Sequence, residues 1–367
     1  MDFTFSEEQY AFEDALRGVL SDIVTPEAIR SRWESSTGMC QTTSAALAEL
    51  GLGGMLVPES LGGLGLLPTD FVLLAQACGY AALPEPLVEQ ILVAAPMLVD
   101  VLDLGLGHSQ VNEVLAGLIS GDQHVAVVPA INAHCNFAEQ ADWFLISHGD
   151  ELHLVDRSAV TLTARQSVDP SRRVAAVAFE PTRVSRLLSA DGGAQLWRSA
   201  LNRGALGVAA QLLGVTAKMI EMSVQYTTDR SQFGRPLGAN QAVKHLLADC
   251  AVALEYARPV VYRAAFTLDQ AAQRGDWAVS HAKAAASSAA QLAARHSMQV
   301  HGAMGYTWEC DLHIWSKRAW ALAREWGDDG FHKNRIHEWL LNPRALIGPE
   351  YTFGRAMPQA NNSAEFV

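Results

Sequence analysis

The segment Arg230-Ser231-Gln232-Phe233-Gly234-Arg235-Pro236-Leu237-Gly238 separates two long runs of helical sequence. Apolar residues recur three and four positions apart on both sides of it, as they do along the buried face of a helix. The positions before it are Leu206, Ala210, Leu213, Ala217, Ile220 and Val224, and those after it are Val243, Leu247, Cys250 and Leu254. Because two glycines and a proline lie between the runs, we expect a short loop joining two long helices of a bundle.

The helical pattern extends from Leu196 to the early 340s and also fills the first third of the chain. Small residues between Ala282 and Ala294 allow helices to approach closely. Near the N-terminus, Ser6 and Gln9 form a possible capping box, and Thr25-Pro26 is expected to end the helix that follows. Further helices are predicted around Ala46 to Leu50, Phe71 to Tyr80 and Pro86 to Leu102.

Between the two helical regions the sequence changes to short β-type runs separated by polar turn residues. These runs are Val125 to Pro129, Trp143 to Ser147, Leu152 to Asp156, Val160 to Leu162 and Val174 to Phe179. The predicted fold is therefore mainly α with a small β domain. The expected divisions are an N-terminal helical domain (1–121), a β domain (122–190), a C-terminal helical bundle (191–345) and a loose tail (346–367).

Composition and charge exclude several classes of protein. Of the 367 residues, 49% are apolar, which is enough for a large core, yet no apolar run reaches the roughly 20 residues of a membrane span. The net charge of −12 opposes general binding to nucleic acid or to an anionic membrane. The five cysteines form no C-x-x-C pair, so buried free thiols are expected. The N-terminus lacks the pattern of a signal peptide, which favours a cytoplasmic protein.

Residues 230–245 contain R-x-x-F-G followed by Q-x-x-x-H, and Gln299 to Tyr306 read Q-V-H-G-A-M-G-Y. These two motifs resemble the R-x-x-F-G...Q-x-x-x-H and Q-x-x-G-G-x-G-Y segments of the acyl-CoA dehydrogenase family of flavoproteins. Weaker matches at Leu56 to Glu59 and Asp169 to Val174 extend the resemblance over about residues 3–345. The resemblance implies a middle β-barrel-like domain, a C-terminal four-helix bundle, and the FAD-dependent α,β-desaturation of a CoA thioester.

The resemblance also implies which residues bind FAD, in this family across a subunit interface. A guanidinium offers several donors to phosphate oxygens, and small residues let the backbone come close to a ligand. An alternative remains open: Arg230 is also a typical cation for a helix C-terminus, and Gly302 and Gly305 are also typical helix C-caps. The implied residues are Arg230, Gln232, Phe233 and Gln241 at the diphosphate and Gln299, Gly302 and Ala303 at the adenosine end.

Parts of the family pattern are missing from this chain. In the family, a T-E-x-x-A-G-S-D-like segment follows the first β strand. In this chain the first predicted strand begins at Val125, and the residues between Ala130 and Ala141 do not contain that segment. Counting from Gly305 without gaps, Trp326 stands at the position of the usual catalytic glutamate, and the position used by other members corresponds to Gly204. Neither residue can accept a proton from a substrate α carbon.

Three hypotheses follow. The preferred one is a non-catalytic subunit of a heteromeric, α2β2 acyl-CoA dehydrogenase, whose catalytic paralogue binds an acyl-CoA or steroid-CoA and passes electrons to an electron-transfer flavoprotein. The second is a self-sufficient enzyme with Glu325 as a relocated base, although Glu325 is interpreted here as a solvated charge. The third is a flavin-free structural subunit. Asp328 and Asp329 are interpreted as turn or N-cap residues.

Overall fold

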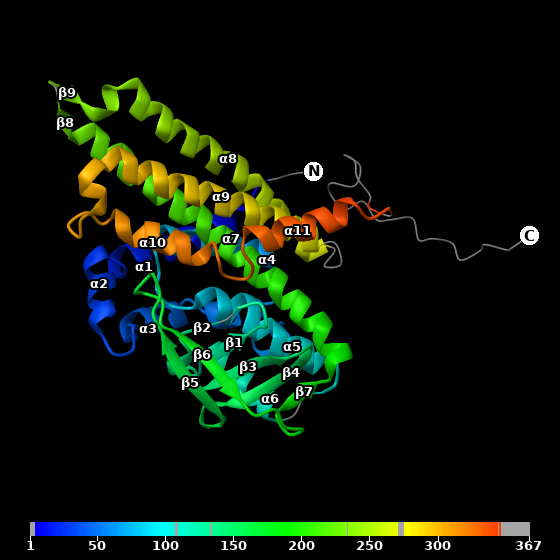
Figure 1. Ribbon diagram of the computed structural model, residues 1–367. Helices are drawn as coiled ribbons and strands as arrows, with labels where there is room; N and C mark the ends of the chain where they lie inside the picture. Colours follow the sequence, from blue (N-terminus) through cyan, green and yellow to red (C-terminus); the bar gives the residue numbers. More distant parts are fainter. Residues whose placement is uncertain are drawn as a thin grey trace, which may run out of the picture.

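A computed structural model of the chain describes residues 4–106, 109–132, 134–232, 234–270, 275–343 and 345. Phe233 and the predicted tail lie outside the described residues. Figure 1 shows helices at both ends of the chain packed together, with the strands on one side of them. The expectation of a mainly α fold with a small β portion is confirmed. The domain bounds stay a prediction.

Local signals position the N-terminal helices. The capping box at the start of α1 (Glu7–Ile23) is present: the Ser6 side chain accepts from the Gln9 N–H at 3.2 Å, and the Gln9 side chain accepts from the Ser6 N–H at 2.8 Å. Thr25 caps the next helix, whose first residue is Pro26. The remaining elements are α2 (Pro26–Glu34), α3 (Gln41–Glu49), α4 (Pro68–Tyr80), the π-helical turn η3 (Glu89–Ala94), α5 (Ala95–Asp103) and α6 (Ser109–Ser120).

The strands form two small sheets, ordered β1-β3-β4-β7 and β2-β6-β5, and β1 is parallel to β3. Side chains such as Phe144, Ile146 and Val155 share a small core with Ala175 of the other sheet. The five predicted strands are present. The sequence pattern missed β2 and β7 because they have only two and three residues. The strands are β1 (Val125–Val128), β2 (Cys135–Asn136), β3 (Trp143–His148), β4 (Glu151–Asp156), β5 (Val160–Arg165), β6 (Val174–Phe179) and β7 (Arg186–Leu188).

The C-terminal region is built on three long helices that pack side by side (Figure 1). Helix α7 is apolar enough to cross a membrane by length and composition, but 72% of its most apolar window is buried inside the protein. The expected loop after Asp229 is a two-stranded hairpin, β8 (Ser231–Gln232) and β9 (Arg235–Pro236). The helices are α7 (Ala190–Asp229), α8 (Gln241–Gln270), α9 (Gly275–His301), α10 (Leu312–Leu322) and α11 (Asp329–Leu340).

Helices α4 and α7 cross with their backbones in contact, which requires glycine on both sides. A Cβ on Gly79 would lie less than 3.0 Å from the Gln211 carbonyl oxygen, and one on Gly214 would lie as close to that of Gln76. Real Cβ atoms do not approach backbone oxygen so closely, so a methyl group here would force the helices apart.

Gly214→Ala is therefore expected to lower the free energy of unfolding by about 1–3 kcal/mol, the usual cost of overpacking. Gly18→Ala is the matched control, because it lies within α1 and a Cβ there would meet nothing within 4 Å. The control should stabilise the protein by up to about 1 kcal/mol through helix propensity. Urea unfolding followed by circular dichroism measures both, and equal effects would contradict the close crossing.

The loop between β5 and β6 connects the β sheets to both helical regions. Asp169 forms a buried ion pair with Arg318 of α10, and the Ser171 hydroxyl accepts from the Trp33 indole N–H at 2.7 Å. Arg173 donates to three carbonyl groups near the end of α2, including that of Ser35 at 2.7 Å. The weak family match at Asp169 to Val174 is therefore a structural connection.

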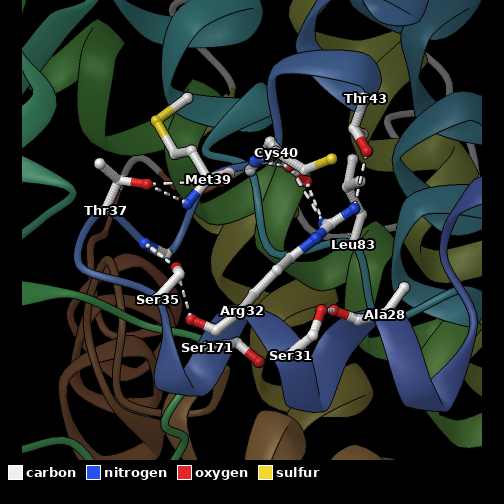
Figure 2. Close-up of polar contacts among 12 residues, drawn as sticks. Ala28, Ser31, Arg32, Ser35, Thr37, Met39, Cys40, Thr43, Leu83 and Ser171 are labelled. Carbon is white, nitrogen blue, oxygen red and sulfur yellow. Dashed lines mark hydrogen bonds and ion pairs between the residues drawn. The ribbon is translucent and has the colours of Figure 1, made fainter.

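The carbonyl of Arg32 in α2 is one of the three that accept from Arg173, and the Arg32 side chain is itself buried. Its guanidinium donates to Glu85 at 3.0 Å and to the Thr43 hydroxyl at 2.7 Å. Figure 2 shows the Arg32 side chain reaching from α2 to Thr43, beside Cys40 at the start of α3. All five cysteines are free, but the expectation of buried thiols is wrong for Cys40 and Cys310, which are half-buried.

Candidate functional site

The predicted cofactor residues that the structure describes lie together at one exposed end of the bundle. Arg230 follows the last turn of α7 and its N–H donates to the Tyr226 carbonyl at 2.9 Å. Gln232 lies in β8, and Gln241 begins α8. Figure 1 shows the β8-β9 hairpin, the start of α8 and the end of α9 at the same end of the molecule. Gln299 lies at that end of α9, and Gly302 and Ala303 lie in the turn after it. These three residues are exposed, as are Arg230, Gln232 and Gln241.

A stack of two aromatic rings joins α7 to α9 at this end of the bundle. The Tyr226 ring lies 4.2 Å from the His301 ring at an angle of 20°, and the Tyr226 hydroxyl donates to the His301 carbonyl at 3.3 Å. Burial lowers the pKa of His301, so its ring is neutral at pH 7. The stack forms one wall of a groove lined by Lys218, Glu221, Met222, Gln225, Tyr226, Asp229, Arg230 and His301.

The groove offers features suited to a phosphate-containing ligand. Within the part of the chain that the structure describes, the exposed Arg230 guanidinium forms no hydrogen bond or ion pair, so its donors are available to an anion. Gly302 has φ +58°, and no atom lies within 4 Å of where its Cβ would stand. A ligand can therefore approach the backbone there. Arg230 does lie at a helix C-terminus, as the alternative interpretation expected, and that position leaves its charge free.

Gly204 and Trp326, the two positions that the family pattern assigns to a catalytic base, lie next to each other in the structure. A Cβ on Gly204 of α7 would lie less than 3.0 Å from the indole ring of Trp326, which is 1% exposed. The indole therefore fills the space that a side chain at either position would share.

The backbone around Trp326 is held from several sides. Trp326 has φ +54°, its N–H donates to Asn132 Oδ1 at 3.0 Å, and its carbonyl accepts from His332 at 2.9 Å. Burial lowers the pKa of His332 to about 3, so its imidazole is neutral. The buried Lys283 ammonium donates to the Ala323 and Gly327 carbonyls, each at 3.1 Å. These contacts fix the loop between α10 and α11, residues 323–328.

The interpretation of Glu325 as a solvated charge is wrong. Its side chain is 10% exposed, and both carboxylate oxygens accept from the Arg172 guanidinium. Burial alone would raise the pKa of Glu325, but the charge and hydrogen bonds of Arg172 outweigh it, and the pKa is lowered. A carboxylate bound in this way is a poor base. Asp328 is the N-cap of α11, as predicted, and its side chain accepts from the Phe331 N–H at 2.9 Å.

Sequence reasoning missed Glu89, which lies in η3 and shares a hydrogen bond with Glu325. Burial, followed by the charge of Glu325, raises the pKa of Glu89 to about 8, although Arg172 opposes the shift. The signal available in the sequence was a lone glutamate within the apolar run after Pro86. π-Helical turns such as η3 occur often at functional sites. Glu89 and Glu325 line one small cavity together with Asn132 and Asn136.

The structure is therefore mainly helical with an intervening β domain, it has an exposed groove beside Arg230 at one end of the bundle, and it places an indole where a catalytic carboxylate was expected. Two family models match it: "Acyl-CoA dehydrogenase, N-terminal domain" over residues 6–122, and "Acyl-CoA dehydrogenase, C-terminal domain" over residues 191–341. Because these matches cover most of its length, the chain belongs to the acyl-CoA dehydrogenase family.

Named relatives agree with this assignment. The chain is 29% identical to "Acyl-CoA dehydrogenase IpdE2" of Mycolicibacterium smegmatis over 87% of its length and 94% of that protein. It is also 29% identical to "Acyl-CoA dehydrogenase IpdE2" of Mycobacterium tuberculosis, over 87% of this chain and 92% of that protein. A chain of the ChsE4-ChsE5 complex from Mycobacterium tuberculosis has the same fold, with a TM-score of 0.81 and 22% identity over 93% of this chain and 99% of that chain.

Proposed function

We propose that this chain is a subunit of an FAD-dependent acyl-CoA dehydrogenase that binds FAD in trans and leaves proton abstraction to a paralogous partner. The reaction removes a proton from the substrate α carbon, and bound FAD supplies the acceptor for the β hydride. The abstraction requires a carboxylate aimed at the α carbon. The observation that carries the proposal is the contact of Trp326 with Gly204, which fills the place of that carboxylate with an indole.

The residues present fit FAD at the exposed end of the bundle. Arg230 would neutralise diphosphate charge, while the amides of Gln241 and Gln299 would donate to oxygen atoms of the ligand. The backbone at Gly302 would approach the adenosine end. The Tyr226–His301 stack would keep the α7 and α9 parts of this surface at a constant spacing.

A heteromeric assembly suits a chain of this kind. One structural neighbour is described as a complex of two differently named chains, ChsE4 and ChsE5, and another as a variant of the Tcur3481-Tcur3483 steroid ACAD, with a TM-score of 0.80 and 22% identity. These neighbours support a heteromeric assembly, and we propose an α2β2 stoichiometry in which the partner binds an acyl-CoA or steroid-CoA. We propose an electron-transfer flavoprotein as the acceptor and the cytoplasm as the location.

Bound flavin tests the proposal directly. The chain should be expressed alone and with each acyl-CoA dehydrogenase paralogue encoded beside it, and FAD per chain measured after gel filtration. We expect no FAD on this chain alone and about one FAD per two chains in the mixed complex, because each site needs residues of both subunits. One FAD per chain in a pure homo-oligomer would overturn the proposal.

Arg230→Ala should weaken FAD binding by the mixed complex by at least roughly tenfold, the value of one charge-assisted contact of about 1.4 kcal/mol. Arg183→Ala is the control, because Arg183 is exposed but lies in the loop before β7, far from the groove in sequence. Flavin titration followed by fluorescence measures both variants. Unchanged flavin binding by Arg230→Ala would instead favour the flavin-free structural subunit.

A self-sufficient enzyme with Glu325 as base is disfavoured by the Arg172 ion pair, which occupies both carboxylate oxygens. Dye reduction by the purified chain with an acyl-CoA, abolished by Glu325→Gln, would restore that alternative.

A further inference from the structure

Three side chains from separate parts of the fold meet in the interior with one positive charge among them. Glu89 comes from η3, Arg172 from the loop between β5 and β6, and Glu325 from the loop between α10 and α11. Both oxygens of Glu325 accept from Arg172, and the Glu89 carboxyl is hydrogen-bonded to Glu325. A hydrogen bond between two carboxyl groups requires a proton on one of them. Two carboxyl groups, one guanidinium and one proton make the cluster neutral.

We propose that Glu89, Arg172 and Glu325 form a proton-dependent tie: one shared proton holds the 323–328 loop closed against the β sheets, and its loss loosens the loop. The proposal concerns this chain alone and does not depend on flavin binding or on a partner.

The charges around the tie favour loosening of the 323–328 loop above neutral pH. The pKa of Glu89 is raised to about 8 by burial and then by the charge of Glu325, so above that pH two carboxylates share one cation. The pKa of the buried Lys283 is lowered to about 7, mainly by burial, so its positive charge is also lost within this pH range. Between pH 6 and pH 9 the surroundings of the loop therefore become more negative by two charges.

The other titratable groups near the tie do not replace the lost charge. His332 is buried and neutral at both pH values, and the pKa of the Cys135 thiol is raised by burial and by the two glutamates. Asp169 is held by Arg318, Asp329 pairs with Lys333, and Asp328 caps α11. The groups that face the tie or line the cleft beside it are Cys135, His134, Asp169, Lys283, Asp328, Asp329 and His332.

The loop has few other contacts with the β side of the molecule. Beyond the Arg172 ion pair, the Trp326 N–H donates to Asn132 Oδ1. Trp326 also has a left-handed backbone conformation, which is strained for a bulky residue and is held only by its surroundings. The loop borders an open cleft lined by residues of the β side, including Ile131, Gln166 and Val168. Loss of the tie would therefore let the loop move into open space.

Hydrogen exchange measured by mass spectrometry at pH 6 and pH 9 tests the tie, with rates divided by the intrinsic rate at each pH. In the wild-type chain, a peptide covering 323–328 should lose protection by roughly tenfold at pH 9, the factor that one pKa unit represents. Glu89→Gln cannot ionise but can still donate to Glu325, so its protection should change by less than about twofold. Glu49→Gln, an exposed residue at the end of α3, should behave as the wild type.

One further variant keeps the proposal decidable if Glu89→Gln does not fold. Glu325→Gln breaks the ion pair with Arg172, so its loop should be poorly protected at both pH values. The proposal is overturned if wild-type protection is the same at pH 6 and pH 9, if Glu89→Gln responds like the wild type, or if Glu325→Gln stays protected.

Discussion

Replacing Arg172 by alanine is expected to lower the free energy of unfolding by about 3–5 kcal/mol, the usual cost of removing one partner of a buried ion pair. The Glu325 side chain is 10% exposed and both of its oxygens accept from Arg172. The alanine variant would leave this carboxylate beside Glu89 without its paired guanidinium. Urea unfolding at pH 7, followed by circular dichroism, measures the loss.

Arg324→Ala is the matched control, because Arg324 precedes Glu325 in the chain but is exposed. It should change the stability by no more than about 0.5 kcal/mol. Removing both charges in Arg172→Ala/Glu325→Ala should cost less than the single Arg172 substitution, because no unpaired carboxylate remains at position 325. A stability within about 1 kcal/mol of wild type for Arg172→Ala would mean that the pair is open in solution.

Trp326→Ala should destabilise the protein by about 3–5 kcal/mol, the range for removing a large buried aromatic side chain. Gly204→Ala should also destabilise it, by about 1–3 kcal/mol, because its Cβ would enter the indole ring of Trp326. The two changes oppose each other, since the first opens the space that the second fills.

The double variant Gly204→Ala/Trp326→Ala is therefore expected to be more stable than the sum of the two single losses predicts. Residues in contact give coupling energies of about 0.5–3 kcal/mol in such cycles. Additive losses, within about 0.5 kcal/mol, would show that positions 204 and 326 are not in contact in solution. Thermal unfolding of the four proteins in one buffer provides the comparison.

Most helices and strands could be predicted from the sequence because their signals are local. The Ser6–Gln9 capping box, Pro26 and the apolar spacing before Arg230 each act over a few neighbouring residues. β2 gave no signal because two residues are too few for an alternating pattern. The helix predicted from Pro86 to Leu102 is present as an unbroken helical run over residues 87–103, but apolar spacing did not reveal that its η3 part is π-helical.

The candidate cofactor residues were also predictable as a group, because they lie in two motifs at the ends of neighbouring helices. Their positions at one exposed end follow from the packing of α7 beside α9. Glu325 was misjudged and Glu89 was missed for a shared reason: the charge that decides the state of both carboxyls belongs to Arg172, which is 153 positions from Glu325.

By itself, the sequence determined the succession of a helical, a β and a second helical region, the membership of a family, and the residue types at positions 204 and 326. Only the tertiary structure decided that the side chains of those two positions compete for the same space, that Glu325 is largely buried, and that it lies beside Glu89 and Arg172. The physical reason is the distance along the chain over which each kind of interaction acts. Helix propensity and turn chemistry depend on neighbours in the chain, whereas desolvation and the interaction of charges depend on groups that only packing brings together.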